Sequence, residues 1–149
     1  MTITIVSHED CTKHDMGNEH PESPARLGAI NDRLIASGLN MILHYEDAPL
    51  ATREQLERVH DKDYVAGIID EAPIAGTRQL DPDTSMNPHT LDAARRAAGA
   101  VIHAVDLAMS GNSKRLFCNV RPPGHHAERH RAMGFCFFNN IAVGAAHAM

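Results

Sequence analysis

Short apolar segments alternate along the chain with longer stretches in which apolar residues recur every three or four positions. The short segments are dense in apolar and β-branched residues, which is typical of strands. They are residues 2–7 (TITIVS), 40–46 (NMILHYE) and 115–120 (RLFCNV). Because the longer stretches have helical spacing, the pattern predicts an α/β fold, a parallel sheet flanked by helices. We expect a single domain over residues 1–149.

The helical stretches have recognisable ends. The first predicted helix begins at Pro21 or Pro24, since proline suits a first turn, and it ends at Gly38. The clearest stripe predicts a helix of about five turns that Gly111 closes. Its apolar positions are Leu91, Ala94, Ala98, Val101 or Ile102, Val105 and Met109.

Weaker signals fill the remaining chain. Thr52 and Gln55 have the spacing of a capping box before a short helix, and another helix is predicted over residues 61–71. Residues 73–88 hold several prolines and a glycine, which predicts a loop. A last helix is predicted from about Phe137.

Composition excludes several classes of protein. Apolar residues make up 43% of the chain and charged residues 22%, as in globular domains. The net charge of -5 disfavours a nucleic-acid binder, which needs a basic face. Neither a membrane span nor a signal peptide is evident, and the three cysteines lack a CxxC pair. These features predict a cytoplasmic protein with reduced thiols.

Two adjacent histidines follow the third predicted strand, in the segment RPPGHHA. Ligands of open α/β sheets bind beyond the carboxyl ends of strands, so a site is expected there. One neutral imidazole, His125 or His126, could take a proton from water while the other, protonated, gives one to a leaving amine. Two alternatives remain: the rings only hydrogen-bond loop backbone, or His126 and His130 help to hold a metal.

Ordered motifs along almost the whole chain resemble the zinc-dependent histone deacetylase family, in its bacterial class II-like members within the arginase and deacetylase superfamily. The matching segments are HPESPARL (20–27), VHDKDYV (59–65), LDPDT (80–84) with AARRAAGA (93–100), and RPPGHHA (121–127) with GFCFFNN (134–140). The resemblance implies the amino-terminal part of an arginase/deacetylase-like fold. It also implies hydrolysis of an acetylated amine, with acetyl-lysine or a polyamine-like small molecule as substrate.

The same resemblance assigns roles to residues. His125 and His126 would be the tandem catalytic histidines, acting as general base and as general acid or electrostatic partner. Gly134 and Phe135 would line a narrow channel for the acyl-lysine chain, and Asp83 would bind substrate backbone at the rim. Taken without the resemblance, the last three residues would be a turn glycine, a core phenylalanine and a turn or capping carboxylate.

Other positions keep open alternatives. Asp81 could replace Asp83 at the rim. Arg26 would either border an inner channel or form a salt bridge on a helix surface. Cys136 is expected to pack, buried, beside the site, and Cys118 to lie in the core.

The chain departs from the family pattern in one respect. The family holds zinc with two aspartates and a histidine, beginning in a DxDxHHG-like strand, and uses a late tyrosine; neither motif is present in this sequence. Zinc is therefore the family cofactor, but we predict no metal ligand and no bound metal in this truncated chain, which alone should be inactive. An open sheet edge should favour a homodimer or higher assembly. The alternative function is a non-catalytic interaction or assembly module.

Overall fold

A three-stranded parallel sheet forms the centre of the computed structural model, which describes residues 3–149. Its strands are β1 (Ile3–Ser7), β2 (Leu43–Asp47) and β5 (Leu116–Cys118), in the order β2-β1-β5. In the register of the sheet, Ile5 lies between Tyr45 on one neighbour and Phe117 on the other. β1 is the central strand, and its middle residues are buried because both faces of a parallel sheet are covered.

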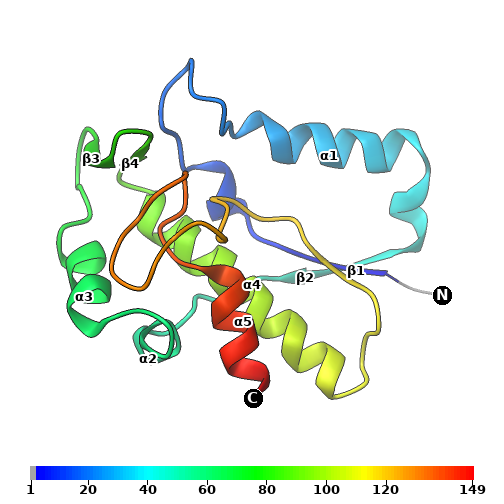
Figure 1. Cartoon of the computed structure of the whole chain (residues 1–149). Coiled ribbons are helices and arrows are strands. Elements are labelled where there is room, and N and C mark those ends of the chain that lie inside the picture. Colours follow the sequence, from blue (N-terminus) through cyan, green and yellow to red (C-terminus); the bar gives the residue numbers. More distant parts are fainter. Residues whose placement is uncertain (1–2) are drawn as a thin grey trace.

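Helices cover the two faces of this sheet. Figure 1 shows α1 (Ala25–Ala36) on one side and α4 (Thr90–Met109) with α5 (Asn140–Ala148) on the other. The α/β fold with a parallel sheet flanked by helices is thus confirmed. No helix within residues 3–149 is both long and apolar enough to cross a membrane.

A smaller layer of helices and strands lies at the amino-terminal end of α4. It consists of α2 (Arg53–Glu57), α3 (Lys62–Asp70) and an antiparallel hairpin of β3 (Arg78–Asp81) and β4 (Thr84–Met86). The loop predicted over residues 73–88 is therefore wrong for the two segments that form these strands, and holds for the residues around and between them. Proline and glycine correctly marked turns, but they could not reveal that the residues between them pair as strands and that β4 is buried.

The predicted element boundaries hold within a few residues. The second strand begins at Leu43, because residues 39–42 form a 3₁₀ turn (η2, Leu39–Ile42). A second 3₁₀ turn, η1 (Glu9–Thr12), follows β1. The capping box of Thr52 and Gln55 is confirmed, with both reciprocal hydrogen bonds present. The last helix begins at Asn140 rather than Phe137, since the Asn139 side chain caps it by accepting the Ala142 N–H.

The main core lies between α4, α5 and the smaller layer. Its buried side chains come from six segments of the chain and include Leu56, Val65, Met86, Ile102, Phe137, Phe138 and Val143. The alanine-rich face of α4 allows close approach, and a Cβ on Gly99 would lie 1.9 Å from the Pro49 carbonyl oxygen. The stripe of α4 does not stay buried throughout, because Met109 at its end is 75% exposed.

Candidate active site

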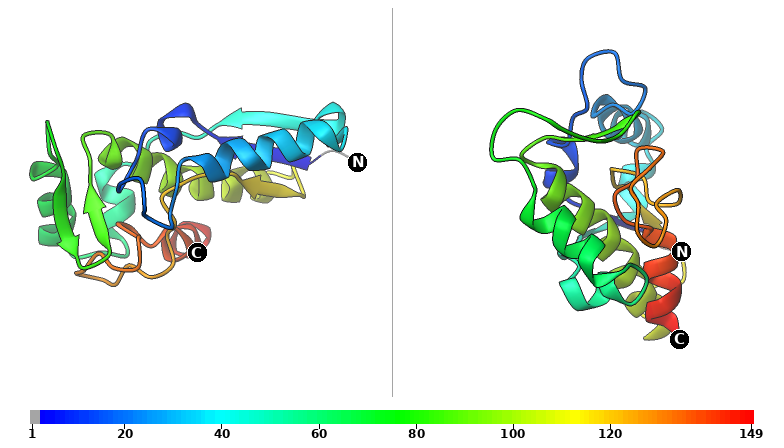
Figure 2. Two further views of the ribbon diagram at one scale, coloured as in Figure 1. Left: turned by 90° about the horizontal axis from the view of Figure 1, so that it is seen from above. Right: turned by 60° about the vertical axis from the view of Figure 1, so that its left-hand side comes forward.

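The tandem histidines lie on the loop that joins β5 to α5, residues 119–139, called the histidine loop below. The loop leaves the carboxyl end of β5, where the Asn119 N–H donates to the carbonyl of Val6 in the central strand. Figure 2 shows the loop, in orange, passing close to the β3–β4 hairpin. The segment RPPGHHA therefore occupies the edge of the sheet at which α/β proteins bind ligands, as its position in the sequence predicted.

His125 and His126 are neighbours in space as well as in sequence. Their ring centroids lie 4.2 Å apart with the planes tilted by 58°, and both residues are exposed. His126 packs directly on Gly134, where an added Cβ would lie 2.9 Å from the His126 Cβ, Cγ and Cδ2. Because Gly134 also has φ +57°, this position requires glycine both for space and for backbone conformation. Two predicted site residues thus meet here.

Phe135 and Asp83, predicted from distant segments, are joined through the side chain of Thr84. The Phe135 N–H donates to the Thr84 hydroxyl (2.9 Å), which in turn donates to Asp83 Oδ1 (2.9 Å). Phe135 has φ +68°, a rare conformation for an aromatic residue, of the kind that recurs at functional sites. Asp81, the alternative rim residue, lies in β3 and pairs with Thr84.

His20 completes this group. Its Nδ1 accepts the Glu22 N–H (3.1 Å), so the hydrogen of the neutral ring is on Nε2, which donates to the Asp83 carbonyl (3.0 Å). Its ring meets the Phe135 ring edge to face, with centroids 4.7 Å apart. The sequence did not assign His20 a role; its place at the head of the HPESPARL motif was the available signal.

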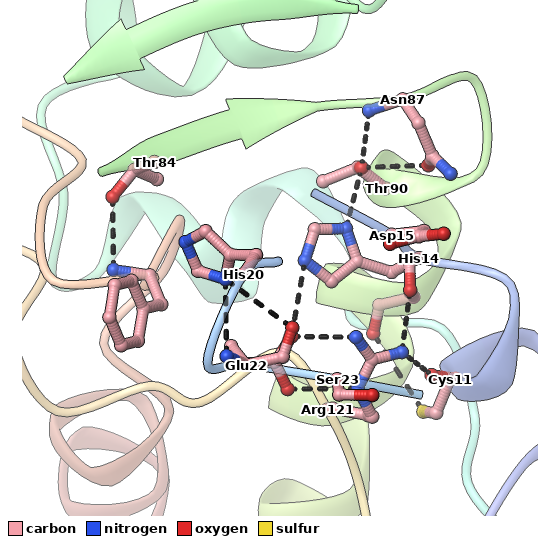
Figure 3. A network of polar contacts seen from close by, with 12 residues as sticks. Cys11, His14, Asp15, His20, Glu22, Ser23, Thr84, Asn87, Thr90 and Arg121 are labelled. Atoms are coloured by element: carbon pink, nitrogen blue, oxygen red, sulfur yellow. Dashed lines mark hydrogen bonds and ion pairs between the residues drawn. The ribbon is translucent and has the colours of Figure 1, made fainter. Parts of the chain in front are cut away.

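A buried ion pair anchors the beginning of the histidine loop (Figure 3). Arg121 is fully buried and donates two parallel hydrogen bonds to the carboxylate of Glu22 (2.8 and 2.6 Å). Its Nη1 donates to the carbonyls of Cys11 (2.8 Å) and His14 (2.6 Å). The guanidinium thus ties the loop to residues 11–22, a function that the sequence did not predict.

His14 lies against this ion pair and is also fully buried. The Thr90 hydroxyl donates to Asn87 Oδ1, so His14 Nδ1 carries the ring hydrogen and donates to Thr90 Oγ1 (2.8 Å). Nε2 is left without a hydrogen-bond partner, 3.6 Å from a Glu22 oxygen. Burial first, and then the charge of Arg121, lower the pKa of His14 from 6.5 to about 4 despite the opposing effect of Glu22. The ring is therefore neutral at physiological pH.

The structure also shows the surroundings of Arg26 and of two cysteines for which the sequence raised expectations. Arg26 donates to the Val120 carbonyl (2.7 Å) and takes part in no ion pair among residues 3–149, so the salt-bridge alternative is wrong. Cys136 is buried beside the site, with Sγ donating to the Gly134 carbonyl (3.2 Å). Cys118 is half-buried at the edge of a small cluster around Val6, and the three cysteines are free thiols.

The donor groups of the described chain do not fit a zinc site. Within residues 3–149 no three histidine, cysteine, aspartate or glutamate side chains are grouped so that they could hold a metal ion. His126 and His130, the metal alternative, are exposed residues that are not part of any such group.

A parallel sheet flanked by helices, with a histidine-bearing loop at the carboxyl ends of its strands, places the protein among the α/β proteins, whose ligands bind at that edge. Comparison with known structures narrows this class. The chain superposes on the crystal structure of the HDA15 HD domain with a TM-score of 0.90 and 33% identity, covering 99% of this chain and 43% of that one.

Sequence comparison leads to the same family. The histone deacetylase domain matches residues 20–149, and this protein belongs to the histone deacetylase family. It is 37% identical to human polyamine deacetylase HDAC10 over 99% of this chain and 24% of that protein. It is 39% identical to a histone deacetylase-like amidohydrolase of Pseudomonas aeruginosa, over 83% of this chain and 32% of that one. The chain thus spans less than half the length of these relatives.

Proposed function

We propose that this protein serves in the hydrolytic deacetylation of an acetylated amine, either acetyl-lysine or a polyamine-like small molecule. The observation that supports this proposal is that residues from two distant motifs lie together in the structure. Gly134 supports His126, while Phe135 is joined to Asp83 through Thr84 and His20. The relatives named as a polyamine deacetylase and as a histone deacetylase-like amidohydrolase support the same reaction class.

The side chains at this site suit amide hydrolysis. One neutral imidazole of the His125 and His126 pair takes a proton from the attacking water, and the other, protonated, delivers a proton to the amine as the C–N bond breaks. Water and amide thereby give acetate and a free amine. The Phe135 ring would pack against the methylenes of the substrate, and the Asp83 carboxylate would accept N–H groups at the rim.

Zinc, which the family resemblance implies, would supply charge stabilisation at the acetyl carbonyl. Because the described residues do not fit a zinc site, we propose that the chain by itself binds no stoichiometric zinc and is inactive. Exposure of both imidazoles supports this, since water then competes with substrate for them. Preorganised electrostatics in a site that excludes water is usually the largest catalytic effect.

An activity assay tests the inactivity of the chain. Purified protein would be incubated with an acetyl-lysine peptide and with an N-acetylated polyamine, while acetate release and bound zinc are measured. We expect neither turnover nor stoichiometric metal. Sustained acetate release by the purified chain, with one zinc bound per molecule, would show that the chain is a complete enzyme.

A binding experiment tests the substrate site independently of turnover. Nε-acetyl-lysine methylamide would be titrated into ¹⁵N-labelled protein, with unacetylated lysine methylamide as the matched control. We expect amide shifts at Gly134, Phe135 and Asp83 for the acetylated compound only. Equal shifts for both compounds, or shifts confined to other residues, would contradict the site.

The alternative function, an assembly module, is favoured by one observation. β5 is an edge strand, paired on one side only, and Phe117 on it is 46% exposed. Unpaired strand edges with apolar side chains invite association. We propose a homodimer or higher assembly, for which light scattering at increasing concentrations should give a rising mass; a constant monomer mass would refute it.

We also propose a cytoplasmic location. The three cysteines are free, which suits a reducing compartment. Cell fractionation tests this proposal, and recovery of the protein in the membrane or secreted fraction would contradict it.

A further inference from the structure

The VHDKDYV motif, residues 59–65, contributes no side chain to the proposed chemistry, yet its polar groups converge on the histidine loop. His60, at the turn between α2 and α3, is only 1% exposed. Its ring lies against the rings of Tyr64 (5.3 Å between centroids) and Phe138 (5.7 Å). Most buried polar groups in proteins are hydrogen-bonded, so the partners of the two His60 ring nitrogens show what the ring holds in place.

Both nitrogens of His60 bind backbone of the histidine loop. Nε2 accepts the Asn139 N–H (2.9 Å), so the hydrogen of the neutral ring is on Nδ1, which donates to the Arg129 carbonyl (3.3 Å). Burial lowers the pKa of His60, which keeps the ring in this neutral form. One ring thus joins two backbone positions that are ten residues apart.

The neighbours of His60 in the motif add further contacts to the same loop. The Asp61 N–H donates to the Arg129 carbonyl (3.0 Å), and the Asp61 carboxylate accepts from Arg129 Nε (2.6 Å). The Tyr64 hydroxyl donates to the Phe137 carbonyl (2.5 Å). These contacts lie on either side of the segment that carries Gly134 and Phe135.

We infer that His60 and Tyr64 are positioning residues. Their hydrogen bonds to the backbone of Arg129, Phe137 and Asn139, together called the clamp, hold the histidine loop on both sides of Gly134 and keep Gly134 packed against His126. The importance of this position for catalysis rests on the proposed function, but the clamp itself does not. Without it, residues 129–139 would keep the Asp61 contacts at Arg129, the bond of Phe135 to Thr84 and the bond of the Asn139 side chain to Ala127. Fewer hydrogen bonds would then hold the backbone on both sides of Gly134, and its contact with His126 would loosen.

Two substitutions at His60 distinguish its hydrogen bond to Asn139 from its hydrogen bond to Arg129. In His60→Asn, the side-chain amide can still donate from about the position of Nδ1, but the acceptor for Asn139 is lost. In His60→Gln, the side-chain oxygen can replace Nε2 as acceptor. Tyr64→Phe removes only the hydroxyl bond to Phe137, and it keeps the proposal testable if the His60 variants do not fold.

The readouts are amide hydrogen exchange at Asn139 and the nuclear Overhauser contact between the His126 ring and the Gly134 Hα. In His60→Asn we expect Asn139 to exchange about tenfold faster, as for loss of one buried hydrogen bond, and the His126 contact to weaken. His60→Gln should retain protection of Asn139. Tyr64→Phe should weaken the His126 contact without changing exchange at Asn139.

Val65→Ala is the matched control, because Val65 is buried in α3 next to the clamp but makes none of its hydrogen bonds. It should lower the melting temperature without affecting either readout. If Val65→Ala changes the His126 contact as strongly as His60→Asn does, or if His60→Asn and Tyr64→Phe both leave it intact, the inference is overturned. A normal clamp in a protein that fails to bind acetyl-lysine methylamide would instead refute the proposed function alone.

Discussion

Acidification should destabilise this protein through one buried histidine. His14 is fully buried beside Arg121, and its pKa falls from 6.5 in the unfolded chain to about 4 in the folded protein. Between these values the unfolded chain binds more protons than the folded one, so stability is complete above pH 6.5 and is lost as the pH falls towards 4. The whole difference corresponds to about 3 kcal/mol, of which about 2 kcal/mol is lost by pH 5.

Urea denaturation at pH 7.5 and pH 5, followed by circular dichroism, measures this loss. His14→Gln should remove most of the dependence on pH, because glutamine can donate to Thr90 without titrating. Some dependence will remain, since burial also lowers the pKa of His60. His130→Gln is the matched control: His130 is exposed, and its substitution should leave the pH dependence unchanged. If His14→Gln keeps the full 2 kcal/mol change, within error of about 0.5 kcal/mol, the assignment to His14 is wrong.

Two further substitutions test the geometry of the site. Gly134→Ala places a Cβ 2.9 Å from His126 at φ +57°, and should lower the free energy of unfolding by about 1–2 kcal/mol while displacing the His126 ring. Urea denaturation and the His126 proton chemical shifts would check this. An unchanged denaturation midpoint would mean that the contact between Gly134 and His126 is loose. Glu22→Gln leaves the buried Arg121 guanidinium without its counter-charge and should lower the free energy of unfolding by about 3 kcal/mol. The control Glu19→Gln, at an exposed position, should have no effect. If Glu22→Gln lowers the free energy of unfolding by less than about 1 kcal/mol, Arg121 is reached by solvent.

Local signals in the sequence predicted the frame of the fold well. β1 follows from a short β-branched run, α4 from a long apolar stripe, and the capping box from two residues three apart. Each of these depends on neighbours within a few positions. The hairpin of β3 and β4 was missed because strand pairing depends on the partner strand and not on the proline and glycine content of the segment.

The site was predictable only in outline. The pair of histidines at the end of a strand was visible in the sequence, and the resemblance added Gly134, Phe135 and Asp83, whose roles remain predictions. The polar groups that arrange these residues were not visible. The Glu22 carboxylate meets Arg121 across 99 positions of the chain, and His60 meets Asn139 across 79. No local pattern encodes such pairings, which appear only once the chain has folded.

The hydrogen bonds of Arg121 also bear on how the protein folds. The partners of its guanidinium lie 99 to 110 positions earlier in the chain. Such long loops close late, because their entropic cost must be met before any contact can reward it. A nascent chain that ends before residue 121 therefore lacks the group that binds the Glu22 carboxylate and the carbonyls of Cys11 and His14, and residues 11–22 cannot complete their buried contacts, however complete the first two strands and the first helix are. The histidine loop and the amino-terminal segment should consequently become ordered together, in one of the last events of folding.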